Sequence, residues 1–202
     1  MNTKVLHNLT CGLYVLSSRS GEKRSGCIIN TVMQVTSKPL RITITVNKAN
    51  YTHDLIAQSG VFTVSLLDQS APFGLFQHFG FQSGRDVDKF KDLSVTEDAN
   101  GVPYLTWASC GYLSCKVVSS MDLGSHTQFL ADVIDCDTLP GAEPVSYAYY
   151  QANIKPKPQE KSTVKGWRCT ICGYIYEGES LPEDFVCPVC HHGPEVFERI
   201  GG

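Results

Sequence analysis

The sequence has no hydrophobic run long enough to cross a membrane and no large excess of charge of either sign. Its 202 residues contain no stretch of the roughly 18 apolar residues that a membrane-spanning helix needs. The net charge of −3 argues against the basic surface of a nucleic-acid-binding protein. No export signal is visible at the N-terminus, because no apolar segment with a small-residue cleavage site follows it. We therefore expect a cytoplasmic protein that binds neither membrane nor nucleic acid.

Three common catalytic motifs are also missing. No G-x-G-x-x-G follows a strand pattern, and no phosphate-binding P-loop occurs. His53 stands beside Asp54, but no nucleophile motif such as G-x-S-x-G accompanies them. A Rossmann-type dinucleotide domain is therefore not indicated, and neither is a serine hydrolase.

The sequence does contain nine cysteines, and they are unevenly distributed. An odd number without an export signal favours a reducing compartment, in which paired cysteines bind metal or perform redox chemistry. Five are scattered among apolar residues and are expected to be small buried hydrophobes, namely Cys11, Cys27, Cys110, Cys115 and Cys136. The other four form two C-x2-C pairs near the end of the chain, Cys169 with Cys172 and Cys187 with Cys190.

A lysine-rich and proline-containing segment, residues 151–165, divides the chain. It has almost no apolar residues and a net charge of +3, so it predicts a partly extended linker. The preceding residues 1–150 carry a net charge of −2, and residues 166–202 carry two arginines against six acids. We expect a large domain, a basic linker and a small acidic domain.

Strand patterns dominate the large domain. Residues 41–47 alternate Ile42, Ile44 and Val46 with threonines, and residues 60–67 form a second apolar run. The segment between them predicts a short helix that Asn50 or Thr52 would cap and Gly60 would end. Further strands are expected in residues 11–19, 26–35, 112–121 and 126–135, the last two around a D-L-G-S turn. Many short strands with few helices predict a mainly β domain, a β-barrel.

The two C-x2-C pairs are separated by 14 residues, 173–186. Two such loops can present four thiolates to one metal ion in tetrahedral geometry. Geometry alone leaves the metal open, since a four-thiolate site suits zinc and iron equally.

The residues around these pairs resemble rubredoxin in the shortened form found at the end of rubrerythrins. The resemblance rests on W-R-C-x-x-C-G-Y-I-Y followed by P-E-D-F-V-C-P-V-C. It implies one iron ion held by Cys169, Cys172, Cys187 and Cys190, with a positive φ at Gly173 that turns backbone amides toward sulfur. It also implies a small aromatic core formed by Trp167, Tyr174, Tyr176, Phe185 and Phe197. The chain departs from full-length rubredoxins in its short loop and in His191, where glycine is usual.

The large domain resembles the flavin reductase family, whose members are FMN-binding split β-barrels. The run N-T…T-S-x-P, V-N-K-x-N-x-T and S-G-x-F-x-V-x-L spans residues 30–66, and S-G-R-D-V-D-K-F, G-V-P-Y-L and L-G-S-H-T-Q-F-L-A-D-V follow in order. With the tail, the chain resembles the high-molecular-weight rubredoxins of anaerobic bacteria. It departs from the family at Leu40, where a second proline is common, and at Ser125, where an aspartate is common.

This resemblance implies a set of flavin-binding residues. Polar loop residues beside a capped helix N-terminus would hold the FMN phosphate, ribityl chain and ring edge. Lys89 would place a positive charge near the flavin, and His126, the candidate catalytic residue, would approach the ring where nicotinamide stacks. Tyr147, Tyr149 and Tyr150 would close the site or pack against a partner subunit. The remaining candidates are Asn30, Thr31, Thr36, Ser37, Asn47, Lys48, Asn50 and Thr52.

The resemblance implies an oxidoreductase that passes electrons from NADH or NADPH through FMN to a rubredoxin iron. The acceptor would be a flavodiiron protein that reduces oxygen or nitric oxide, and the chain would form a homodimer. Two alternatives stay open: a flavin or ferric reductase that releases reduced flavin, and a non-enzymatic flavin-binding protein with a zinc ribbon. The sequence does not decide between NADH and NADPH, nor fix the redox potentials or the arrangement of the domains.

Overall fold

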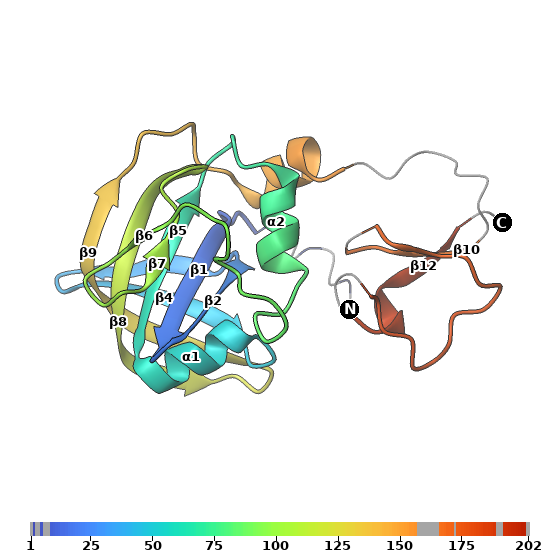
Figure 1. The fold of residues 1–202 in the computed structure, drawn as a ribbon, viewed down its shortest axis with the longest axis horizontal. Helices are drawn as coiled ribbons and strands as arrows, with labels where there is room; N and C mark the ends of the chain where they lie inside the picture. The colour runs from blue at the N-terminus through green and yellow to red at the C-terminus, as the bar shows by residue number, and fades with distance from the viewer. Residues whose placement is uncertain are drawn as a thin grey trace.

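The computed structural model contains a curled β-sheet with short helices around it, followed by a small second sheet (Figure 1). It describes residues 2, 5, 9–156, 166–171, 173–188 and 192–200. Strands are the main regular structure of the large domain, and its longest described helix has nine residues. The expected mainly β fold is therefore confirmed.

The secondary-structure elements run in the following order. The large domain contains β1 (Tyr14–Ser20), β2 (Lys23–Ile29), β3 (Val32–Ser37), β4 (Leu40–Asn47), α1 (Tyr51–Ser59), β5 (Val61–Leu67), α2 (Phe73–Gly80), β6 (Thr96–Glu97), β7 (Pro103–Tyr104), β8 (Ser109–Asp122), β9 (His126–Thr138) and α3 (Tyr147–Tyr149), which a π-helical turn (Tyr150–Ile154) continues. The small domain contains β10 (Gly166–Cys169), β11 (Ile175–Tyr176), a 3-10 turn (Pro194–Val196) and β12 (Phe197–Ile200).

Seven strands of the large domain form one antiparallel sheet in the order β2-β1-β5-β8-β9-β4-β3. The sheet curls on itself, because side chains from near both ends of this order share one core. Cys27 and Ile29 of β2 belong to the same buried cluster as Ile42 and Ile44 of β4. Alternation along β4 points these isoleucines inward and the threonines between them outward, as the sequence predicts. The result is a barrel around one apolar interior.

Helix α1 lies at one end of this barrel and ends as its sequence predicts (Figure 1). The side chain of Asn50 accepts a hydrogen bond from the amide of Thr52, so Asn50 is the N-cap. Gly60 ends the helix with φ +71°, a left-handed conformation that glycine adopts without strain. The helix buries Leu55 and Ile56 against the barrel. These contacts fix the position of the first turn of α1, and the candidate functional site lies beside this turn.

A second apolar cluster lies between the sheet and α2. It includes Val15 of β1, Leu75, Phe76 and Phe79 of α2, and Tyr150 from the π-helical turn. The rings of Phe76 and Tyr150 have centroids 4.6 Å apart. The barrel domain therefore extends through Ile154, four residues into the segment expected to be a linker. Residues 157–165 of that segment lie outside the described part of the chain.

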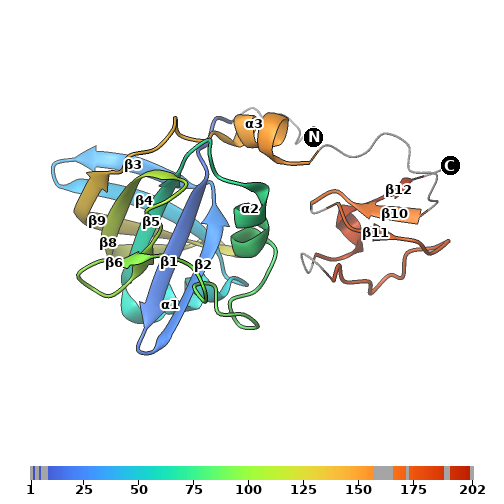
Figure 2. The same ribbon diagram turned by 45° about the horizontal axis from the view of Figure 1, so that its top comes forward.

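The small domain is a three-stranded sheet in the order β11-β10-β12. Figure 2, which turns the molecule by 45°, shows its strands and loops as a unit that follows α3 in the chain. Arg168 on β10 pairs with Glu198, opposite it on β12. Among the helices that the structure describes, none combines the length and the apolar character that crossing a bilayer requires.

Candidate functional site

The N-terminus of α1 meets strand β2 in a buried polar contact. The hydroxyl of Thr52 donates to the Ser25 hydroxyl over 3.2 Å, and both residues are fully buried or nearly so. Gly84 approaches the same point, because a Cβ on Gly84 would lie 2.0 Å from Ser25 Oγ. The chain thus needs a residue without a side chain here, and the loop carrying Gly84 is held against the first turn of α1.

Lys89 is buried beside this contact, with 1% of its surface exposed. Its ammonium group donates to the backbone carbonyl of His78, and the His78 ring bonds back to the carbonyl of Lys89 at 2.8 Å. Burial lowers the pKa of Lys89 to about 8, because the charged form loses its hydration. Burial raises the pKa of the neighbouring Cys27 thiol to about 11, an increase that the Thr52 hydroxyl and the Lys89 charge oppose. Lys89 is therefore a cation held inside the domain near Thr52.

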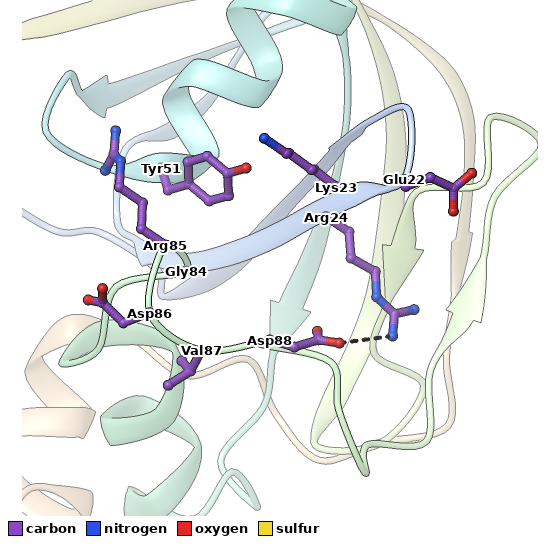
Figure 3. A pocket seen from close by; sticks show the side chains of 9 residues that line it. All are labelled: Glu22, Lys23, Arg24, Tyr51, Gly84, Arg85, Asp86, Val87 and Asp88. Carbon is purple, nitrogen blue, oxygen red and sulfur yellow. Dashed lines mark ion pairs between the residues drawn. The ribbon is translucent and has the colours of Figure 1, made fainter.

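A cavity of about 540 Å³ opens beside the first turn of α1. Tyr51 lines one side of it, and Gly84 and the loop that follows line another (Figure 3). Charge of both signs surrounds it: Lys23, Arg24 and Arg85 against Glu22, Asp86 and Asp88. Part of this charge is compensated, since Arg24 pairs with Asp88 at 3.6 Å. The lining side chains therefore carry no excess of either charge.

None of the residues that line this cavity is among the flavin-binding residues expected from the sequence, and Arg85 is the lining residue that binds the start of α1 from the loop after α2. Its guanidinium donates to the carbonyl of Ala49 at 3.0 Å and to the Asp54 carboxylate at 2.5 Å. It also lies over the Tyr51 ring, 5.2 Å from the centroid. These contacts hold Arg85 at the start of α1, where the Asp54 carboxylate compensates its charge. Arg85 belongs to the S-G-R-D-V-D-K-F segment, in which the family resemblance implies a flavin contact for Lys89 alone.

Three other predicted site residues come together at the end of β4. Asn47 pairs with His126 across the β4–β9 ladder. Lys48 bonds to the Ser125 carbonyl through its amide at 3.0 Å and to the Asp122 carboxylate through its ammonium group at 2.6 Å. The Ser125 hydroxyl lies 2.8 Å from Nδ1 of His126. His126 stays a predicted catalytic residue.

The other candidates lie along the β3–β4 hairpin and are not all neighbours. Asn30 and Thr31 are exposed at the start of β3, where the Thr31 hydroxyl bonds to the Thr45 carbonyl at 2.6 Å. Thr36 and Ser37 lie at the hairpin tip. The length of β4, about 23 Å at roughly 3.3 Å per residue, separates that tip from Asn47. Their contact with a flavin stays a prediction.

The tyrosines near the end of the large domain pack onto their own chain. Tyr147 and Tyr149 are partly buried against the cluster that contains α2, and Tyr150 is buried in it. The ring of Tyr147 lies 6.3 Å from that of Tyr150. Within the described residues they cover α2, and none of them lines the cavity beside α1.

In the small domain, two of the four predicted metal ligands lie within the described residues. Cys169 and Cys187 are almost fully buried and form one cluster, although 18 positions separate them in the chain. Cys172, Cys190 and the neighbouring His191 lie outside the described residues. The structure therefore brings one cysteine of each C-x2-C pair to the same buried place, as a four-thiolate site requires.

The backbone around both cysteines is turned tightly. The Gly173 amide donates to the Cys169 carbonyl at 2.9 Å, with Gly173 at φ +81° as the sequence predicts. The Cys187 amide donates to the carbonyl of His192 at 2.9 Å. These two hydrogen bonds to backbone carbonyls fold the chain tightly around the two thiols. These residues fit a thiolate-bound metal ion.

Aromatic rings cover one side of this cluster. The rings of Tyr176 and Phe185 lie 4.7 Å apart, and Phe185 meets Phe197 edge-on at 5.3 Å. Tyr174 and Phe197 also pack against the two cysteines. Four of the five rings expected in the aromatic core, Tyr174, Tyr176, Phe185 and Phe197, therefore make these contacts, which do not include Trp167. These rings exclude water from the described side of the cysteine pair, which lowers the local dielectric constant.

The comparisons with known proteins agree with both halves of this description. Residues 6–157 match the flavin reductase like domain, and residues 167–198 match the rubrerythrin, rubredoxin-like domain. The chain belongs to the flavin reductase family. It carries a rubredoxin-like domain in addition, at the position expected from its cysteine pairs.

Among similar proteins, a high molecular weight rubredoxin of Moorella thermoacetica is 35% identical and matches 99% of this chain and 100% of its own length. A ferric-chelate reductase (NAD(P)H) of Archaeoglobus fulgidus is 35% identical over 81% of this chain and 97% of its own. Among solved structures, the styrene monooxygenase flavin reductase of Pseudomonas putida S12 is 26% identical. The structural match covers 71% of this chain and 89% of the reductase chain, with a TM-score of 0.61.

Family membership establishes the class of reaction. The chain is an oxidoreductase that transfers electrons from NAD(P)H through a flavin to its rubredoxin-like domain. The large domain binds the flavin, and the tail is the one-electron carrier. The reaction requires a flavin-binding domain and a metal-binding domain, which correspond to the barrel and to the domain with the buried cysteine pair.

Proposed function

We propose that the protein is an NAD(P)H-dependent FMN protein that reduces an iron ion in its own tail and passes the electrons to a partner. The observation that carries this proposal is the presence, in one chain, of a flavin reductase barrel and a buried cysteine pair in a rubredoxin-like tail. When bound, the flavin takes a hydride from NAD(P)H and gives up its two electrons singly to the iron.

The flavin phosphate, in this proposal, binds at the start of α1. Asn50 and Thr52 would offer polar groups there, Arg85 would offer a guanidinium beside the helix N-terminus, and the buried Lys89 would supply a second cation. We propose FMN as the flavin because FMN ends in a phosphate, and this end of the molecule would lie at the protein surface beside α1. The cavity beside Tyr51 supports this placement, since it reaches the same turn of the helix.

The ribityl chain and ring would lie toward the predicted residues at the end of β4. Asn47, Lys48 and His126 are adjacent there, next to the turn between β8 and β9. We propose that His126 orients the nicotinamide ring and transfers no proton, because a serine and not a carboxylate is its hydrogen-bond partner. Hydride transfer requires positioning of the two rings above all.

The tail would hold one iron ion through Cys169, Cys172, Cys187 and Cys190. Support comes from the buried pair of Cys169 and Cys187, the turn at Gly173 and the aromatic shell. Amide groups aimed at sulfur and restricted access of water both tune the potential of such a centre.

The partner would recognise the acidic surface of the tail. Five carboxylates outside the Arg168–Glu198 pair are exposed there, Glu177, Glu179, Glu183, Asp184 and Glu195. They would steer a partner with a basic surface, and we propose a flavodiiron protein that reduces oxygen or nitric oxide. The barrel thiols Cys11, Cys27, Cys110, Cys115 and Cys136 are free, which is typical of a reducing compartment such as the cytoplasm.

We further propose a homodimer formed through the outer face of β3, β4, β9 and β8. Ser119, Leu130, Thr43 and Met33 form one row across these four strands. Met121 lies two residues further on the same face. Met33 is 66% exposed and Met121 is 54% exposed, so this face leaves large apolar side chains in water.

One second function has a specific observation in its favour. The ferric-chelate reductase relative matches 81% of this chain, so a reductase that releases reduced flavin or reduces ferric chelates is an alternative. A spectrum of the purified protein after gel filtration, with metal analysis, tests the choice. Retained FMN together with one iron per chain supports our proposal. Loss of the flavin during filtration favours the alternative, and stoichiometric zinc in protein produced with ample iron contradicts the electron-transfer role of the tail.

A further inference from the structure

An apolar contact joins the barrel to the cysteine cluster of the tail. Five partly buried hydrophobic side chains pack against Cys169 and Cys187. Four of them belong to the tail itself, Ile171, Tyr174, Val196 and Phe197. The fifth is Phe81, which directly follows α2 in the barrel domain. Figures 1 and 2 both show α2 on the side of the barrel that faces the tail.

Phe81 is firmly attached to the barrel. Its amide donates to the carbonyl of Gln77 at 2.9 Å and ends α2. Its ring meets that of Phe73 edge-on, with centroids 6.1 Å apart and planes at 69°. Phe73 in turn packs against the apolar cluster that contains Leu75 and Phe76. A series of apolar contacts therefore connects the second apolar cluster, between the sheet and α2, with the cysteine pair.

The same contact places the cysteines near the candidate flavin cavity. Gly84, which lines that cavity, follows Phe81 by three residues, and three residues span at most about 11 Å. A polar contact also joins the domains, from the ammonium group of Lys155 to the carbonyl of Thr170 at 3.2 Å, but it is exposed to water. Phe81 thus packs directly against the cysteine cluster and begins the loop that reaches the cavity at Gly84.

We propose that Phe81 is a positioning residue that holds the metal-binding turns of the tail against the barrel beside the flavin cavity. This inference rests on the proposed function. It adds an explanation of how the flavin and the iron of one chain are kept close together. The electron transfer that Phe81 would support forms and breaks no bond. One electron leaves the reduced flavin, and one ferric ion becomes ferrous.

Amide hydrogen exchange in the oxidised, flavin- and iron-loaded full chain tests the docking directly. Truncating a central interface aromatic residue typically weakens an association about fivefold or more. We expect Phe81→Ala to accelerate exchange of the amides in residues 81–84 and 166–171 by about that factor. Phe81→Leu should retain most of the protection. Val186→Ala should retain all of it, because Val186 is 54% exposed and lies beside Cys187 outside the cluster. Equal exchange in Phe81→Ala and the unmodified protein overturns the proposal.

Anaerobic rapid mixing with NADH separates this inference from the proposed function. In Phe81→Ala we expect flavin reduction at the unmodified rate and iron reduction that is about fivefold slower, with Phe81→Leu close to normal. Iron reduction at the same rate in Phe81→Ala contradicts the role of Phe81 and leaves the proposed function intact. Iron that stays ferric in the unmodified protein contradicts the proposed function and, with it, the role of Phe81 in electron transfer, whatever the exchange experiment shows.

Discussion

At the scale of single residues, Lys89 carries the strongest electrostatic prediction. Its pKa is lowered to about 8 by burial, so in the flavin-free protein its charge is lost as the pH rises through about 8. If Lys89 stabilises the bound anionic cofactor, the dissociation constant of FMN rises above pH 8, by at most about tenfold per pH unit. Below pH 8 the cation is present and the affinity should change little. A flavin titration between pH 6.5 and 9.5 measures this.

The control for this prediction is the neighbouring exposed lysine. Lys89→Met should weaken FMN binding at pH 7 and remove the change near pH 8. Lys91→Met should do neither, since Lys91 is exposed. A dissociation constant that is the same for Lys89→Met and the unmodified protein would mean that the buried charge does not act on the flavin.

The sequence predicted some of these residues better than others. The meeting of Cys169 and Cys187 could be predicted because two C-x2-C pairs together provide the four thiolates of one tetrahedral site. The positive φ of Gly173 follows from the same local turn. Arg85 could not be predicted in this way, because its position depends on contacts with Ala49 and Asp54, more than 30 residues earlier in the chain.

At the scale of secondary-structure elements, the start of α1 combines a structural role with a proposed binding role. Asn50 caps the helix, so Asn50→Ala should lower the free energy of unfolding of the barrel by about 1 kcal/mol. Asn50→Asp should keep the cap, because aspartate accepts the same hydrogen bond. It should nevertheless weaken FMN binding, since it places a carboxylate beside the phosphate. Urea unfolding and a flavin titration on both variants measure the two effects separately.

These two variants decide between the roles of Asn50. An Asn50→Asp protein that binds FMN as tightly as the unmodified protein would show that Asn50 is only a helix cap. Loss of stability in Asn50→Asp equal to that in Asn50→Ala would contradict the capping contact itself.

The strands and α1 were predictable from the sequence, whereas α2 was not. Strand β4 alternates strictly between isoleucine or valine and polar residues, and α1 is bounded by Asn50 and Gly60. Helix α2, Phe73–Gly80, contains two glycines and several phenylalanines, which are weak helix formers. Its helical form depends on burying Leu75, Phe76 and Phe79 in the second cluster, and such tertiary packing is not visible in a local pattern.

At the scale of the whole molecule, the outer face of β3, β4, β9 and β8 predicts self-association. Met33 is 66% exposed on this face, so Met33→Glu should convert a dimer into a monomer by placing a charge in an apolar interface. Val186→Glu is a matched control, because Val186 is an exposed apolar residue of the tail. Light scattering after gel filtration gives the mass. An unmodified chain that is monomeric at micromolar concentration contradicts the homodimer.

The central claim is that electrons pass from NAD(P)H through the flavin to the metal centre within one chain. Anaerobic addition of NADH to the purified protein, followed by visible absorption, tests it most directly. We expect the flavin bands and the ferric-thiolate absorption to bleach together, with the flavin reduced first and the iron following without any added carrier. A flavin that bleaches completely while the iron of the tail remains ferric would contradict the account.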